Sequence, residues 1–131
     1  TIAVERDGKS IEKPEFDINP RGLGVAGGKF GQVDNGEALF ITFEQDVFVE
    51  TVGVVAGNGI CGGFYQVGDR APLAIYCTDA DNDSKDQHGL ISDLGLLKRG
   101  ETLRLDSSPH FGVEAPGQWR LSSLSVRIVS D

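Results

Sequence analysis

The chain has 131 residues, of which 39% are hydrophobic and 18 are glycine, and its formal net charge at pH 7 is −8. This length fits one domain, residues 1–131, and the spread of apolar runs along it argues against disorder. The negative charge argues against nucleic acid and anionic lipid as partners, because both bind basic patches. No run approaches the roughly 18 apolar residues of a membrane span. The sequence begins at Thr1 and contains no Met, so we expect a mature product or a piece of a larger secreted protein.

The first twenty residues predict short strands. Asp7-Gly8 is a strong reverse-turn signal between two short apolar pieces, so residues 1–12 predict a small hairpin. Phe16 and Ile18 alternate with polar residues and predict another strand, which Pro20 ends.

Residues 22–43 are the stretch around which we expect the fold to be organised. Their first half is rich in glycine, which disfavours helix. Asp34-Asn35-Gly36-Glu37 predicts a turn, because Asn-Gly readily takes the positive φ of a tight reversal. The strict alternation after it predicts a strand at residues 37–43 with Leu39, Ile41 and Phe43 on one face.

Residues 47–55 predict the next strand, and the short link from residue 43 suggests that the two strands pair as a hairpin. Strict alternation places Val47, Val49, Thr51 and Gly53 on one face and Phe48, Glu50, Val52 and Val54 on the other. The glycine-rich loop at residues 57–63 lacks the Lys-Ser/Thr of a phosphate-binding loop, so it predicts a strand connection.

The second half of the chain predicts further short strands. They lie at residues 64–67, 72–77 and 102–105, and a last strand at residues 119–129 follows. In the second of these, Leu73, Ile75 and Cys77 are expected on one face. The apolar run at residues 91–97 fits either a helical turn or a strand, and residues 98–100 predict a turn. Ser122-Ser123 predicts a bulge, because the apolar series resumes one residue out of phase after it.

These elements predict an all-β fold, an antiparallel β-sandwich of about eight to ten strands. Three segments also resemble the β-sandwich ectodomains of secreted bacterial proteins of the PEP-CTERM type. These segments are GLGV at residues 22–25, VDNGEALFITFEQDVFVETVGV at 33–54 and QWRLSSLSVRIV at 118–129, although the sequence has no Pro-Glu-Pro motif. The resemblance implies an extracellular or cell-surface location and favours jelly-roll connectivity.

Cys61 and Cys77 are the two cysteines of the chain. Their separation fits neither C-x-x-C redox chemistry nor the usual close zinc pairs. A structural disulfide is the simpler hypothesis, with a redox or metal pair as the alternative. A disulfide implies an oxidising compartment outside the cytoplasm.

The most polar segment follows Cys77 and carries carboxylates at nearly alternate positions. Ca²⁺ takes six to eight oxygen ligands at about 2.3–2.6 Å, which such a loop can supply. The spacing is not that of an EF-hand, and a solvated acidic turn is the alternative reading. The candidate calcium ligands are Asp79, Asp81, Asp83 and Asp86, and Asp34 with Glu37 forms a smaller rival cluster.

The sequence carries no recognisable catalytic motif. His88 and His110 lie outside any nucleophile motif, and carboxylate pairs are expected by chance in so acidic a chain. Two non-catalytic hypotheses remain. One is a carbohydrate-binding module that takes a polysaccharide or cell-surface glycan, and the other is a structural or adhesive ectodomain without a small ligand.

Sugars stack on aromatic faces and hydrogen-bond to the polar side chains beside them. Tyr65 and Tyr76 are the leading aromatic candidates, because the phase of Tyr76 points it away from the face of Leu73 and Ile75. Trp119 is also a candidate, although its phase in the last strand places it with Leu121 toward the core. The polar candidates are Gln66, Asp69, Arg70 and His88.

Overall fold

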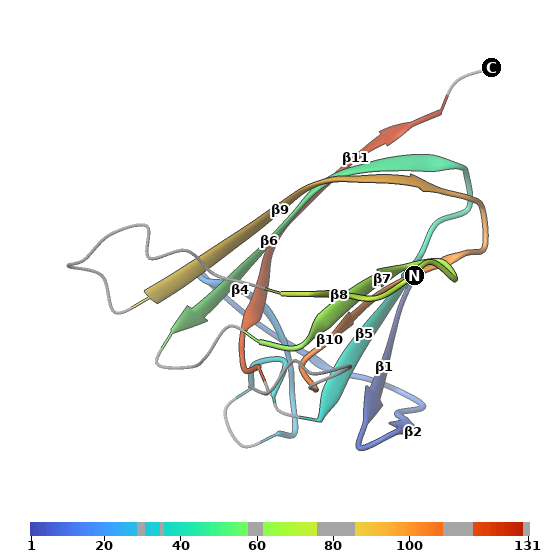
Figure 1. The fold of residues 1–131 in the computed structure, drawn as a ribbon. Coiled ribbons are helices and arrows are strands. Elements are labelled where there is room, and N and C mark those ends of the chain that lie inside the picture. Colours follow the sequence, from blue (N-terminus) through green and yellow to red (C-terminus); the bar gives the residue numbers. More distant parts are fainter. Residues whose placement is uncertain (29–30, 35, 58–61, 76–85, 109–116, 130–131) are drawn as a thin grey trace.

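The computed structural model describes residues 1–28, 31–34, 36–57, 62–75, 86–108 and 117–129. These residues form strands, turns and bends but no helix, and every strand pair is antiparallel (Figure 1). The strands are β1 (Ile2–Arg6), β2 (Lys9–Ser10), β3 (Phe16–Asn19), β4 (Gly22–Val25), β5 (Glu37–Thr42), β6 (Val47–Gly57), β7 (Phe64–Val67), β8 (Leu73–Ala74), β9 (Asp86–Leu97), β10 (Thr102–Asp106) and β11 (Arg120–Ile128). The predicted all-β sandwich is confirmed.

Two sheets make up the sandwich. The six-stranded sheet has the order β2-β1-β5-β10-β7-β8, and the five-stranded sheet has the order β3-β4-β11-β6-β9. Only the links β1–β2, β3–β4 and β7–β8 join neighbours within a sheet, and every other link between these strands crosses to the opposite sheet. The faces of the two sheets that point toward each other enclose the hydrophobic core.

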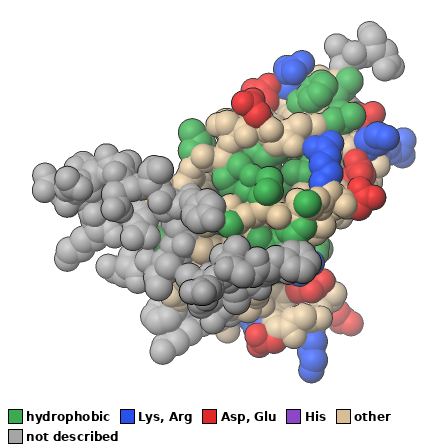
Figure 2. All heavy atoms as spheres, viewed as in Figure 1, with side chains coloured by type: hydrophobic (Ala, Val, Ile, Leu, Met, Phe, Trp, Pro, Cys, Tyr) green, Lys and Arg blue, Asp and Glu red, His purple; other side chains and the backbone are tan. Residues whose placement is uncertain are grey.

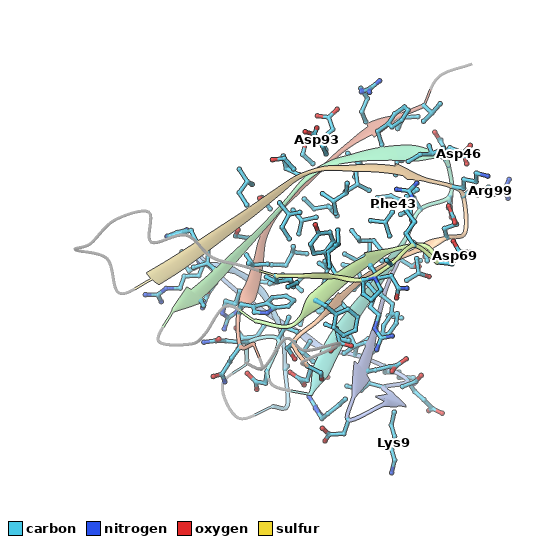
Figure 3. All side chains as sticks on the ribbon, in the orientation of Figure 1. Lys9, Phe43, Asp46, Asp69, Asp93 and Arg99 are labelled. Atoms are coloured by element: carbon cyan, nitrogen blue, oxygen red, sulfur yellow. The ribbon has the colours of Figure 1, made fainter. Side chains whose placement is uncertain are left out.

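The predicted hairpin between residues 37–43 and 47–55 is wrong. β5 lies between β1 and β10, whereas β6 lies in the other sheet between β11 and β9. The crossing segment is held by the β9–β10 turn, where Gly100 N donates to Phe43 O (3.2 Å) and Arg99 N donates to Asp46 Oδ1 (2.7 Å). Figure 3 shows Phe43, Asp46 and Arg99 together at this end, with Lys9 at the other end.

The predicted alternation of buried and outward-facing residues along β6 holds only from Val47 to Glu50. Val47 and Val49 are buried, but Val52 and Val54 on the later part of the strand are buried as well. The register of β6 with both β9 and β11 shifts at Glu50. A bulge there turns the second half of β6 over, so that both halves bury their valines in the core.

Most of the local predictions from turn chemistry are confirmed. Asp7 and Gly8 have φ of 53° and 79° and join β1 to β2 as a tight hairpin. Glu37 N donates to Asp34 O (2.9 Å), which closes the predicted turn. Ser122 is the extra residue of a bulge in β11, at the predicted position.

In the second half of the chain, the structure decides one open prediction and corrects another. Residues 91–97 form part of strand β9, so the strand alternative is confirmed. Leu73 and Ile75 do not share a buried face, because Leu73 is 56% exposed while Ile75 is buried. β8 is only two residues long, and alternation therefore does not extend from Leu73 to Ile75.

Candidate functional site

A pocket of about 580 Å³ lies on the outer face of the six-stranded sheet. Its lining comes from β1, β5, β10 and β7, the four adjacent strands in the middle of this sheet, and from the turns at their ends. We call it the outer-face pocket. The side chains that matter most are Glu5, Asp7, Phe64, Gln66, Arg104 and Asp106.

Strand register explains why these residues meet. Glu5 is opposite Ala38, Ala38 is opposite Asp106, and Asp106 is opposite Phe64. The four side chains therefore form one row across the sheet, pointing away from the core residues that alternate with them. Neighbouring strands are about 4.8 Å apart, so the Glu5 and Asp106 backbones are roughly 10 Å apart. The small side chain of Ala38 leaves space between the two carboxylates.

Arg104 and Asp106 form an ion pair inside the pocket. They are two residues apart on β10, so both side chains point outward. Arg104 Nε and Nη2 donate to Asp106 Oδ2 (3.0 and 2.7 Å), and Ser108 N donates to Oδ1 (2.8 Å). Asp106 is only 4% exposed. Both of its oxygens are therefore already engaged.

Two aromatic rings fix the guanidinium of Arg104. The carbon between its nitrogens lies 5.1 Å from the ring centre of Phe40 and also 5.1 Å from that of Phe64. Cations over aromatic rings at this distance are stabilised by the ring quadrupole. Together with Asp106, the rings hold Arg104 in one place, so the polar surface of the pocket is organised before any ligand arrives.

A buried network supports the end of β5 next to the pocket. Glu37 Oε2 lies 2.7 Å from Nε of Arg6, and Oε1 accepts a hydrogen bond from Asp34 N (2.8 Å). The Ser107 hydroxyl lies 2.6 Å from Asp34 O and 2.7 Å from Glu37 O. Burial raises the pKa of Glu37 above its ordinary value, against the opposing effects of the Asp34 amide and Arg6. The rival acidic cluster of Asp34 and Glu37 thus holds the turn before β5.

The structure separates the predicted ligand residues of β7. Gln66 lines the outer-face pocket, and its Nε2 donates to Arg70 O (2.8 Å). Tyr65 is the preceding residue and points to the opposite face of the sheet, where it packs against the core. Burial raises the pKa of its hydroxyl. Of the two neighbours, only Gln66 belongs to the outer-face pocket.

Tyr65 and Arg70 line a second, smaller pocket of about 100 Å³ between the sheets. We call it the edge pocket. Arg70 Nη1 and Nη2 donate to the carbonyls of Leu94 (3.1 Å) and Leu96 (2.8 Å) on β9. The guanidinium thereby ties the β7–β8 turn to the edge of the other sheet.

Figure 2 shows hydrophobic side chains gathered in the middle of its view, with charged side chains around part of the rim.

Three other predicted ligand residues lie apart from both pockets. Asp69 is exposed in the β7–β8 turn (Figure 3). His88 is exposed on β9, opposite Val55 in the five-stranded sheet. Trp119 is fully buried, and its Nε1 donates to Gly62 O (2.9 Å), so the ring has no exposed face for a sugar. Of the predicted ligand residues, Tyr65 and Arg70 meet in the edge pocket, while Gln66 lines the outer-face pocket and Asp69 and His88 lie elsewhere.

Several predicted residues fall outside the described part of the chain. They include both cysteines, Cys61 and Cys77, and the aromatic candidate Tyr76. Among the calcium candidates, Asp79, Asp81 and Asp83 also fall outside, and Asp86 is described only as the backbone of β9. Within the described ranges, no group of three or more His, Cys, Asp or Glu is arranged to hold a metal ion.

The sequence did not reveal five of the six main pocket side chains, which are Glu5, Asp7, Phe64, Arg104 and Asp106. The alternation of Leu103 and Leu105 already implies that Arg104 and Asp106 point outward together. Their position beside Glu5 depends on strand order, which sequence periodicity does not encode.

No protein-family model, curated protein or solved structure matches this chain. No helix able to cross a membrane occurs among the residues that the structure describes. The functional assignment therefore depends on the pocket geometry and on the sequence patterns.

Proposed function

We propose that the protein is a non-catalytic, extracellular carbohydrate-binding domain, and that the outer-face pocket is its binding site. The observation that carries this proposal is the Arg104–Asp106 pair in a pocket of about 580 Å³, with the guanidinium of Arg104 lying over two phenylalanine rings. This volume lies in the range of small-ligand sites, which is about 300–1,000 Å³.

The chemistry of the lining suits sugar hydroxyls. A hydroxyl both donates and accepts, and the pocket offers acceptors in Glu5 and Asp7, a donor in Arg104 and both kinds of group in Gln66. Pro72 adds apolar surface beside these groups, where the C–H face of a sugar ring can lie, whereas Phe64 is buried beneath Arg104. The site is a pocket with mixed lining rather than a flat aromatic platform.

A binding role fits the carboxylates better than hydrolysis does. Glycoside hydrolysis needs one carboxyl group to give a proton and a second to act as base or nucleophile. Both carboxylate oxygens of Asp106 accept hydrogen bonds, Oδ2 from Arg104 and Oδ1 from Ser108, so the side chain is held in a fixed position in the pocket lining. We therefore infer that Asp106 orients Arg104.

The resemblance to PEP-CTERM-type ectodomains and the isolated cysteine pair support a secreted bacterial protein with a Cys61–Cys77 disulfide. The acidic run from Asp79 to Asp86 supports a structural calcium site in the same part of the chain. Calcium added to chelator-treated protein should raise the melting temperature, because a ligand that binds only the folded state stabilises it. An Asp81→Ala, Asp83→Ala variant should lose this rise, and a native protein that shows no rise would remove calcium from the proposal.

A structural or adhesive ectodomain is the second candidate. The burial of aromatic rings favours it, because the aromatic side chains among the described residues are all buried or half-buried. Such a domain would have no small-molecule ligand, and its outer face would contact other proteins or the surrounding polymer.

Retention on gels that contain different polysaccharides separates the two candidates. The native chain should be retarded by at least one neutral or charged polysaccharide, and Gln66→Ala should reduce the retardation because Gln66 lines the outer-face pocket. His88→Ala is the matched control, since His88 is exposed on the other sheet and should leave binding unchanged. A native chain that no polysaccharide retards would favour the structural ectodomain. Equal loss in both variants would move the site away from the outer-face pocket.

A further inference from the structure

We propose that the outer-face pocket selects glycans that carry a protonated amine, such as polymers of glucosamine, over neutral and acidic glycans. This inference rests on the proposed carbohydrate binding and names the ligand class of the same site. It follows from the balance of charges among the described lining residues and from the way in which Arg104 is held.

The pocket lining carries more negative than positive charge. Three carboxylates line it, those of Glu5, Asp7 and Asp106, against the single guanidinium of Arg104 among the described residues. Asp106 and Arg104 neutralise each other, which leaves two negative charges on the β1 side. A concave site with an excess of one sign concentrates ligands of the opposite sign.

The nearby cations do not offset these carboxylates. Lys9 is opposite Arg6 in the β1–β2 hairpin, so it shares the face of Arg6. Glu5 is opposite Ser10 and points to the other face, toward the pocket. Arg6 itself is paired with Glu37 and also donates to Ala26 O (3.1 Å). Among the residues that the structure describes, Arg104 is therefore the one basic side chain that lines the pocket with Glu5 and Asp7.

The charge of Arg104 is offset by Asp106, to which its Nε and Nη2 donate, and Phe40 and Phe64 hold the guanidinium in that orientation. A uronate or sulfate that reached the remaining N–H groups of Arg104 would be repelled by Asp106, Glu5 and Asp7. An ammonium group in the space beside Ala38 and Gly36 would instead lie between carboxylates on two sides.

The test measures binding of β-1,4-linked oligosaccharides of equal length by calorimetry. The four probes are oligomers of glucosamine, N-acetylglucosamine, glucose and glucuronate. At low salt and slightly acidic pH we expect the glucosamine oligomer to bind about tenfold more tightly than its N-acetylated form. The advantage should disappear between about 0.01 M and about 1 M salt, as the Debye length falls from about 30 Å to about 3 Å.

A pair of double variants separates the pocket from the overall charge of the protein. Glu5→Gln with Asp7→Asn removes both pocket charges, and Asn suits the positive φ of Asp7. Glu12→Gln with Glu15→Gln removes the same charge from exposed positions outside the pocket lining. The first variant should lose the preference for the amine-bearing oligomer, and the second should keep it.

The possible failures are distinguishable. Equal binding of the amine-bearing and neutral oligomers, a preference for glucuronate, or the same loss in both double variants would overturn the amine selectivity while leaving carbohydrate binding in place. If none of the four probes binds and no polysaccharide gel retards the native chain, the proposed function fails, and this inference fails with it.

Discussion

The ion pair of Arg104 and Asp106 gives the sharpest stability prediction, and Asp106→Asn is the change that tests it. The asparagine keeps an oxygen for the amide of Ser108 but places an NH₂ group where Oδ2 accepts two hydrogen bonds from Arg104. Asp106 is 4% exposed, so water cannot readily replace the lost partner. The side chain of Arg104 is 36% exposed, which reduces the effect.

We expect Asp106→Asn to lower the free energy of unfolding by about 2 kcal/mol, within the range of 1.5–3 kcal/mol for hydrogen bonds to charged groups. A domain of this length loses roughly 4 °C in melting temperature per kcal/mol, so the predicted fall is about 8 °C. The measurement is thermal and urea unfolding followed by circular dichroism, with the urea slope unchanged.

Glu50→Gln is the matched control for this prediction. Glu50 pairs with Arg127 at 3.2 Å, but their side chains are 46% and 64% exposed. Such a pair contributes about 0.5 kcal/mol or less. If Asp106→Asn costs no more than Glu50→Gln, then the Arg104–Asp106 pair is as solvated as a surface pair, and the picture of a pre-organised pocket is wrong.

Three further predictions concern the fold and its surroundings. Gly63→Ala should lower the free energy of unfolding by about 3 kcal/mol or more, because φ is 93° and the added Cβ would meet a backbone carbonyl of β10. Gly8→Ala is the control, with φ of 79° and open space around the added Cβ, and should cost about 1 kcal/mol. Similar losses of stability in the two variants would contradict the close approach of Gly63 to β10. The raised pKa of Glu37 means that the folded state keeps its proton to higher pH, so its contribution to stability is complete below about 4.5 and falls as pH rises through the folded pKa. A plot of melting temperature against pH should show this slope in the native chain and not in Glu37→Gln. Identical profiles for the two proteins would show that Glu37 does not contribute to the pH dependence of stability. A thiol titration of denatured, unreduced protein should detect no free thiol at Cys61 or Cys77, and two reactive thiols would reject the disulfide together with a main reason for placing the domain outside the cell.

Local sequence patterns predicted the elements that depend on local geometry. The Asp7-Gly8 hairpin follows from two residues that tolerate positive φ, and the strand at Leu39 and Ile41 follows from strict alternation. The bulge at Ser122 was visible as a change of phase in the apolar series. Each of these features is determined within a few residues.

The sequence did not predict features that depend on partners distant in the chain. The bulge at Glu50 moves Val52 and Val54 to the buried face, but valines occur at both odd and even positions of residues 47–55, so the sequence fits either phase. The pairing of β5 with β10 rather than with β6 is a matter of sheet order, and the short link between residues 43 and 47 suggested the opposite.

The outer-face pocket is the clearest case of this limit. It combines Glu5 from β1, Phe64 from β7 and the Arg104–Asp106 pair from β10, which only the strand order and register bring together. Gln66 was predicted as a ligand residue and lines this pocket, whereas its neighbour Tyr65 points to the other face. The prediction identified a relevant strand but not the face that carries the pocket.

An NMR titration of the ¹⁵N-labelled chain with a glycan that it binds tests the central claim most directly. The largest amide shifts should occur at Gly8, Gly36, Phe64 and Ser108, which line the outer-face pocket on different strands and turns. Amides beside the edge pocket, such as that of Asp93, should change little. Shifts concentrated around the edge pocket or on the five-stranded sheet, with none at the outer-face pocket, would contradict the account.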